Sequence, residues 1–187
     1  MGTPLSKMTL AQFIEWENAQ VEKHEFVRGQ VMAVEGGRRV HGLVLGNAFA
    51  SLKQQLRGTP CRVFAGSMKL AIGNDLFYPD VFVTCDPADL RTEQIFHAPK
   101  LIIEVLSPST EGYDRGLKFS HYRALPSLAE YLLVHPDTRE ASLFRRGTDG
   151  LFTLHDFSNA PQVELASIGC VLNRDELFEG VDAEPEG

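Results

Sequence analysis

Apolar residues recur at helical spacing in two N-terminal segments of the chain. In residues 10–18 they lie three and four apart, and Thr9 stands directly before them, where threonine commonly caps a helix. The second segment runs from Val40 to Leu56 with the same spacing and stops before Gly58. The pattern therefore predicts two amphipathic helices.

Other parts of the N-terminal half have the pattern of short strands. Residues 25–34 read as two strands around Arg28-Gly29, which is a tight hairpin signal. Residues 61–70 and 77–85 flank the sequence Gly-Asn-Asp. They predict a second hairpin.

Residues 101–106 form a short apolar run, which is typical of a central strand. A helix is predicted from about residue 113 to residue 125, because Pro126 stops it. Residues 131–134 and 141–145 predict two more strands, and only weak strand-like pieces follow Gly150.

This order of elements predicts an α/β (α+β) fold. A single mixed sheet flanked by helices, preceded by an N-terminal helix and hairpin, accounts for it. The 187 residues suffice for the core of one domain and are few for two. We expect one domain over residues 1–181 and a disordered tail over residues 182–187.

Composition excludes some classes of protein. At 43% hydrophobic and 23% charged residues, the chain resembles an ordinary soluble globular protein. Its apolar runs are far shorter than a membrane span, and no basic segment followed by an apolar one opens the chain. Cys61, Cys85 and Cys170 are far apart and have no metal-ligand spacing. A cytoplasmic protein without a membrane segment is expected.

The formal net charge of -7 argues against a protein that coats nucleic acid, because phosphate binding relies on clustered Lys and Arg. The net charge does not exclude a nuclease, since carboxylates that bind divalent ions would contribute several of those negative charges. Small basic patches could touch phosphate, although a solvated surface is the ordinary place for them: Arg38-Arg39, Arg115 with Lys118, and Arg145-Arg146.

Two carboxylates interrupt segments that otherwise read as buried strand. Asp80 follows Pro79 in one run, and Glu104 is the fourth residue of residues 101–106. An ionised carboxylate is costly in an apolar setting unless a cation or donors compensate it, so a shared Mg²⁺ or Mn²⁺ is predicted. The alternatives are turn chemistry after Pro79 for Asp80 and a buried pair with Arg or Lys for Glu104.

A lysine follows the second carboxylate. Asp114, Lys118 and Tyr122 are each four apart, so they share one face of the predicted helix. Beside a metal, Lys118 could position a nucleophile or offset transition-state charge. An exposed salt bridge between Asp114 and Lys118 is the ordinary alternative.

His41 and Glu25 are further candidates, each with two interpretations. His41 falls on the presumed core face of its helix, where a histidine is more often packed than catalytic, but in the first turn it could also face the cleft. Glu25 is either an edge-strand carboxylate at the same site or simply solvated.

At these residues the chain resembles the PD-(D/E)XK nuclease superfamily, and within it the Uma-two branch of restriction endonuclease-like proteins. The resemblance lies in Tyr78-Pro79-Asp80-Val81, in residues 101–110 and 130–136, and in the spacing of Asp114, Lys118 and Tyr122. Upstream, residues 24–31 resemble the N-terminal hairpin of that branch, and His41 resembles its helix start.

The resemblance implies that Asp80 and Glu104 are metal ligands and that the backbone carbonyl of Val105 completes the site. The superfamily pattern would place a lysine where this chain has Leu106. The resemblance to this branch implies that Lys118, on the next helix, is the substitute.

The leading hypothesis is a Mg²⁺-dependent DNA endonuclease. A homodimer is expected, because two sites are the simplest way to cut two strands. One rival is a nuclease fold that has lost catalysis and binds nucleic acid or protein. The other is a metal-dependent hydrolase of a small phosphate ester.

Overall fold

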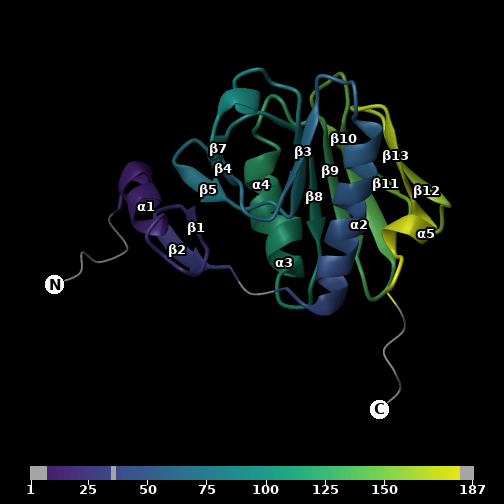
Figure 1. The fold of residues 1–187 in the computed structure, drawn as a ribbon, viewed down its shortest axis with the longest axis horizontal. Coiled ribbons are helices and arrows are strands. Elements are labelled where there is room, and N and C mark those ends of the chain that lie inside the picture. The colour runs from purple at the N-terminus through teal and green to yellow at the C-terminus, as the bar shows by residue number, and fades with distance from the viewer. Residues whose placement is uncertain (1–7, 35–36, 182–187) are drawn as a thin grey trace, which may run out of the picture.

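A six-stranded mixed sheet forms the centre of the computed structural model, which describes residues 8–34 and 37–181 (Figure 1). The strand order is β11-β10-β9-β8-β6-β3, in which β8 and β9 run parallel and the other neighbours run antiparallel. The strands are β3 (Arg62–Ala65), β6 (Val81–Thr84), β8 (Pro99–Val105), β9 (Glu130–His135), β10 (Glu140–Arg146) and β11 (Phe152–Asp156). The central position predicted for residues 101–106 is confirmed, as are the two strands that follow.

Alternation along β8 sends its side chains to the two faces of this sheet. Leu101 and Ile103 pack in one core with α2 (Arg39–Gln55), the helix that crosses this face in Figure 1. Ile102 packs in a second core on the opposite face. Glu104 lies two residues after Ile102, so its carboxylate points to the same face of the sheet, the face of the second core.

A five-stranded sheet with the order β2-β1-β5-β4-β7 supplies apolar residues to the second core. Its strands are β1 (His24–Val27), β2 (Gln30–Ala33), β4 (Lys69–Ile72), β5 (Asp75–Phe77) and β7 (Ile95–Phe96). The helix α1 (Leu10–Glu17) packs on this sheet, where the ring of Phe13 stacks on Phe26 with 4.9 Å between centroids.

The predicted N-terminal helix and hairpin are confirmed. The side chain of Thr9 accepts a bond from the backbone of Gln12, and the Gln12 side chain accepts one from the backbone of Thr9. In the β1–β2 turn, Arg28 and Gly29 have φ angles of 52° and 78°. Two consecutive positive φ angles match the twist of a tight hairpin.

The prediction of a single sheet was wrong, because the strands predicted at residues 61–70 and 77–85 each break in the middle. Gly66, with a φ angle of 77°, follows the end of β3, and Pro79, which has no N–H, separates β5 from β6. The predicted hairpin pairing persists in two parts, which belong to different sheets: β3 pairs with β6, and β4 pairs with β5. The break at Pro79 and Asp80 therefore lies where the two sheets diverge.

The helical segment after β8 differs from the regular helix predicted for residues 113–125. It begins with α3 (Glu111–Tyr113), continues through a π-helical turn (Asp114–Lys118) and ends with α4 (Phe119–Tyr122). π-helical turns are rare in proteins, but those that occur are often found at functional sites. The sequence patterns also missed β7 and a 3-10 turn (Asp89–Arg91), because both are too short to show a period.

A two-stranded ribbon of β12 (Gln162–Leu165) and β13 (Cys170–Asn173) packs with α5 (Arg174–Leu177) in the same core as α2. Glu130 anchors the turn of this ribbon, since it is fully buried and accepts bonds from Arg145 Nε at 2.7 Å and the amide of Ser167 at 3.0 Å. The expectation for residues 182–187 lies outside the described residues.

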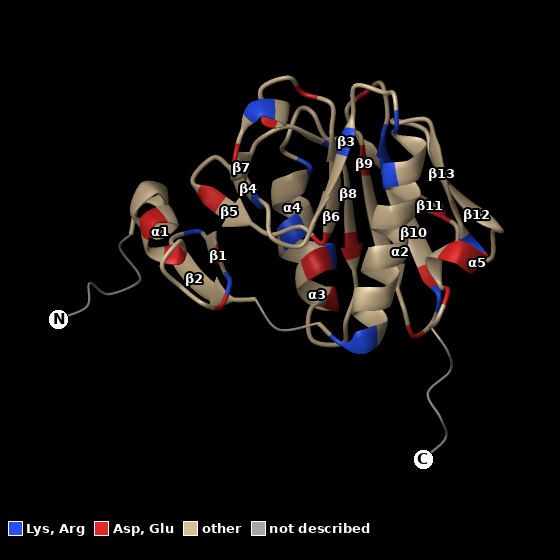
Figure 2. Ribbon diagram, viewed as in Figure 1, with Lys and Arg blue, Asp and Glu red and all other residues tan. Residues whose placement is uncertain are grey.

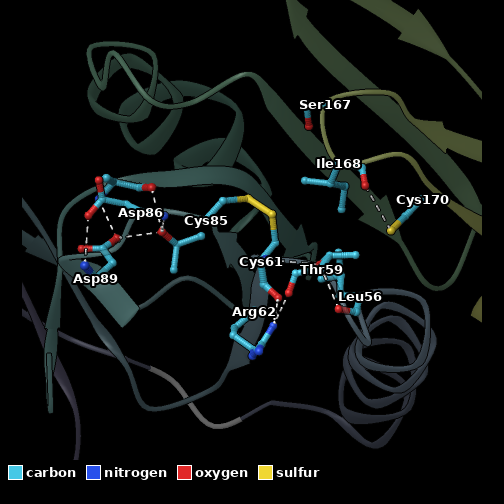
Figure 3. The surroundings of a disulfide bond; sticks show 12 residues. Leu56, Thr59, Cys61, Arg62, Cys85, Asp86, Asp89, Ser167, Ile168 and Cys170 are labelled. Atoms are coloured by element: carbon cyan, nitrogen blue, oxygen red, sulfur yellow. Dashed lines mark hydrogen bonds between the residues drawn. A yellow bond between two sulfur atoms is a disulfide. The ribbon is translucent and has the colours of Figure 1, made fainter. Parts of the chain in front are cut away.

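Two of the three cysteines are joined (Figure 3). Arg62 lies opposite Thr84 in the β3–β6 ladder, so Cys61 and Cys85 are the next opposing pair, and they form a disulfide. Cys170 is free and buried. The wide spacing of the cysteines in the sequence gives no sign of this pairing, because strand register decides it. The cytoplasmic location stays a prediction. In the described part of the chain, no helix has the length and apolarity to cross a membrane.

Candidate active site

Strand register places Asp80 beside Glu104. Val81 lies opposite Ile103 in the antiparallel β6–β8 pair, so Asp80 is the next residue toward Glu104. The amide of Asp80 donates to Glu104 Oε2 at 3.3 Å, and the amide of Val105 donates to Asp80 Oδ2 at 2.8 Å. The two acids singled out from the sequence are therefore neighbours where β6 begins and β8 ends.

His41 connects the first turn of α2 to Asp80. Its Nε2 atom lies 3.1 Å from Asp80 Oδ2, and the two side chains are 19% and 21% exposed. This hydrogen bond raises the pKa of His41 against the opposing effect of burial. Of the two interpretations of His41, the structure supports the one in which it faces the cleft.

Lys118 is the centre of a buried ion-pair cluster. Its Nζ atom lies 3.2 Å from Glu104 Oε1, 3.3 Å from Glu25 Oε1 and 3.4 Å from Asp114 Oδ1. All four residues are buried. The Asp114–Lys118 pair is therefore not the exposed surface salt bridge of the ordinary alternative, and Glu25 is not solvated.

Burial and a shortage of positive charge control protonation in this cluster. Burial raises the pKa of Glu104 and Asp114 above the usual carboxyl range, although Lys118 opposes the change. Burial alone would lower the pKa of Lys118, but the surrounding carboxylates together outweigh burial and raise that pKa. Lys118 is therefore a protonated ammonium, and the cluster has more carboxyl groups than one lysine can neutralise.

Tyrosine residues hold two of these carboxylates in place. The hydroxyl of Tyr122 donates to Glu104 Oε1 at 2.9 Å, and the hydroxyl of Tyr113 donates to Glu25 Oε2 at 2.8 Å. Burial and the neighbouring carboxylates raise the pKa of both tyrosines, so both hydroxyls remain donors. The amide of Tyr78 donates to Glu25 Oε1 at 3.0 Å. Glu104 and Glu25 are therefore held from several sides.

Sequence reasoning missed Tyr113. On a regular α-helix, residues five apart point roughly 140° away from each other, so Tyr113 would not share the face of Lys118. The π-helical turn bonds residues five apart, and it brings the Tyr113 ring within 5.5 Å of Lys118 Nζ. No pattern in the sequence signals this turn.

A cavity of about 540 Å³ opens onto these groups. Its lining comes from both sheets, the start of α2 and the segment after β8, and includes Glu25, His41, Asp80, Glu104, Asp114 and Lys118. Tyr122 lies behind it, bonded to Glu104. Figure 2 shows acidic residues of β8 and α3 near basic residues of the adjoining helical turn. The side chains proposed from the sequence for metal binding and catalysis, and their proposed neighbours, thus lie at the cavity or in contact with it.

The basic patches proposed for phosphate contact are mostly engaged elsewhere. Arg145 pairs with buried Glu130, and Arg146 donates to three backbone carbonyls, those of Arg123, Leu125 and Leu128. Arg115 pairs with Glu111 at 2.7 Å. Arg38 lines the cavity, and its guanidinium bonds both oxygens of Asp137 at 2.8 and 2.9 Å.

The central mixed sheet and its flanking helices define a restriction endonuclease-like nuclease fold. A solved structure described as a putative nuclease belonging to DUF820, from Anabaena variabilis ATCC 29413, matches it with a TM-score of 0.79. The match covers 94% of this chain and 100% of that chain at 18% sequence identity, so it establishes the fold.

Residues 10–173 match the Uma2 family model, described as "Putative restriction endonuclease". The chain belongs to this family. The uncharacterized protein slr1290 of Synechocystis sp. (strain PCC 6803) is 37% identical over 182 residues, which cover 96% of each chain. The uncharacterized protein sll1609 of the same organism is 32% identical over 131 residues, 68% of this chain and 74% of that protein.

Proposed function

We propose that this protein is a Mg²⁺-dependent endonuclease that hydrolyses phosphodiester bonds of DNA. One juxtaposition carries the proposal: Asp80 and Glu104 meet across β6 and β8, and Lys118 lies 3.2 Å from Glu104. Two carboxylates with an ammonium beside them are the groups used in metal-assisted phosphodiester hydrolysis. Membership of a family described as "Putative restriction endonuclease" supports the same activity.

The donor set fits a hard divalent cation. Asp80 Oδ1 accepts no hydrogen bond from the described residues, and Glu104 Oε2 accepts an amide at 3.3 Å. Carboxylate oxygens suit Mg²⁺ or Mn²⁺, and Mg²⁺ usually keeps several waters. Within residues 8–34 and 37–181, no three His, Cys, Asp or Glu side chains form a ready-made cage. Asp80 and Glu104 would hold the ion, with the carbonyl of Val105 as a third ligand and waters completing the shell.

The charge balance of the cavity favours a cation. Four carboxylates line it, from Glu25, Asp80, Glu104 and Asp114. The lining contains two permanent cations among its described residues, Lys118 and Arg38, and Arg38 is already paired with Asp137. Because uncompensated buried charge is unfavourable, a divalent ion would stabilise this arrangement.

When bound, the metal ion would polarise a phosphoryl oxygen and lower the pKa of a bound water. The side chains of the protein orient the groups around it. Lys118, held by Glu25 and Asp114, presents positive charge that offsets the charge developing on the phosphate. Tyr122 fixes the orientation of Glu104, and His41 fixes that of Asp80.

Cleavage of supercoiled plasmid and of a labelled single strand, with and without Mg²⁺, tests the proposal. We expect metal-dependent cleavage by the wild type and a rate at least about 100-fold lower for Asp80→Ala, which lacks a proposed ligand. Asp156→Ala is the matched control, because Asp156 is exposed on β11. Equal rates for the two variants would refute the assignment of Asp80.

For cleavage of both strands of a duplex we further propose a homodimer, since two sites are the simplest arrangement for two cuts. Sedimentation equilibrium with and without duplex DNA measures the association. A protein that stays monomeric while it makes double-strand breaks would contradict this part of the proposal.

The second candidate function is a nuclease fold that binds nucleic acid or protein without cleaving it. Two observations favour it: three carboxylates already engage Lys118, and Leu106 occupies the place where the superfamily pattern would have lysine. DNA binding by the wild type without a metal-dependent product would support this candidate over the first.

A further inference from the structure

The groups proposed for chemistry lie below the surface of the molecule. Glu104 is 2% exposed and Lys118 is 7% exposed, and both line the cavity of about 540 Å³. Asp80 is the most accessible of the three, with a side chain that is 21% exposed. A phosphodiester must therefore enter the cavity before these groups can act on it.

The size of the cavity limits what can enter. Pockets of roughly 300–1,000 Å³ enclose ligands of drug size, which corresponds to one or two nucleotides. The phosphates of a continuous duplex lie on the outside of a wide, stiff helix, whose stacked and paired bases cannot follow a phosphate into a cavity of this volume. An unpaired strand is flexible and can bring a phosphate and its base inside without the cost of unpairing, which base-extruding enzymes have to meet.

Among its described residues, the cavity has few cations to offer a nucleic acid. Phosphate contacts of a duplex and of a single strand both rely on Lys and Arg, so specific binding here has to use other contacts as well. Here Lys118 is buried among three carboxylates, and Arg38 holds Asp137. The rest of the lining is largely uncharged: it includes Met32 and Ala33 of β2 and the run of Ser, Pro and Thr at residues 107–110.

Tyr113 supplies an aromatic ring at the wall of the cavity. Its hydroxyl is fixed to Glu25, and Lys118 Nζ lies 5.5 Å from the ring centroid, so the ring is held in place. It is partly exposed. Single-strand sites use such rings as platforms on which an unpaired base stacks.

We propose that the cavity admits one unpaired strand, with Tyr113 as a stacking platform, and that the substrate is single-stranded DNA or an unpaired stretch of a duplex. The inference rests on the proposed nuclease function for its chemistry, but the preference for an unpaired strand resides in the cavity itself. A single-strand substrate needs one site, so a monomer suffices for it.

Fluorescence anisotropy of a labelled 12-nucleotide single strand and of the matching duplex tests the preference. The full chain is used, with Ca²⁺ in place of Mg²⁺ to suppress cleavage. We expect the single strand to bind at least about tenfold more tightly, and in Mg²⁺ to be cleaved faster by a similar factor. Equal or tighter binding of the duplex would overturn the inference, and so would the absence of binding to either.

Variants of the cavity wall make the test specific. Ala33→Trp narrows the cavity from the exposed end of β2, and it should weaken single-strand binding about tenfold. Thr153→Trp on β11 makes the same change at an exposed position away from the cavity, and it should leave binding unchanged. Tyr113→Ala should weaken binding about fivefold or more, and Tyr113→Phe, which keeps the ring, should weaken it less. Equal binding by the two tryptophan variants would overturn the inference.

The two proposals fail in different ways. If the single strand binds preferentially but no DNA is cleaved, the proposed catalysis is wrong and the strand preference stands. If the duplex is bound and cleaved as well as the single strand, the nuclease proposal stands and the strand preference is wrong.

Discussion

The backbone amide of Asp80 donates to the side chain of Glu104 over 3.3 Å, although 24 residues separate them in sequence. The contact exists because Val81 pairs with Ile103 across β6 and β8. The amide of Val105 returns a bond to Asp80 Oδ2 at 2.8 Å. The position of each acid therefore depends on the pairing of the two strands that carry them.

We expect Mn²⁺ to raise the unfolding temperature of the wild type but not that of Asp80→Ala. Binding to the native state alone stabilises it by about 2.7 kcal/mol at a hundredfold excess over Kd. Scanning fluorimetry during a Mn²⁺ titration measures the shift, with Asp156→Ala as the control for loss of an exposed carboxylate. A shift of the same size in Asp80→Ala would place the metal elsewhere.

Replacing Lys118 by Met should destabilise the protein in the absence of metal. The change leaves Glu25, Glu104 and Asp114 buried without their shared ammonium, and breaking a buried pair in this way costs about 3–5 kcal/mol. Urea unfolding measures the loss against Lys53→Met, an exposed lysine in the last turn of α2. Similar losses for the two variants would show that the cluster is not held by Lys118.

The same variant tests the role of Lys118 in cleavage. Lys118→Met should abolish cleavage and spare Mn²⁺ affinity, because the proposed ligands, Asp80 directly before β6 and Glu104 on β8, are not on the helix. Isothermal titration with Mn²⁺ and a cleavage assay on the same preparation separate the two effects. An unchanged cleavage rate would remove Lys118 from the proposed mechanism.

Glu130→Ala should destabilise the fold without affecting metal binding. Glu130 is fully buried and holds Arg145 and Ser167, so its removal leaves the ribbon of β12 and β13 poorly anchored, and we expect a loss of about 3–5 kcal/mol. Glu140→Ala, at an exposed position of β10, is the matched control. A loss below about 1 kcal/mol in urea unfolding would contradict this role.

Reduction of the Cys61–Cys85 disulfide should lower the free energy of unfolding by about 2–4 kcal/mol, because the bond closes a loop with a sequence separation of 24 residues. Urea unfolding with and without reductant measures the change. The double variant Cys61→Ala, Cys85→Ala should unfold at the same midpoint in both conditions. A response to reductant in that variant would assign the effect to another group.

The main parts of the candidate site were predictable from the sequence, for a physical reason. Asp80 and Glu104 attract attention because ionised groups are unfavourable in apolar runs, and Lys118 because four-residue spacing aligns side chains on a helix. Four-residue spacing does not reveal Tyr113, which reaches Glu25 and Lys118 through a π-helical turn. It also could not decide whether His41 packs in the core or faces Asp80.

Local periodicity was sufficient for the elements themselves, such as α1, α2 and β8, because burial of one face imposes a repeat that is visible in a single segment. The division of the strands at Gly66 and Pro79 into two sheets, and the pairing of Cys61 with Cys85, depend on which distant strands become neighbours. The same holds for the gathering of four carboxyl groups around one cavity. Contacts between residues far apart in the chain determine these features, and a one-dimensional pattern does not contain them.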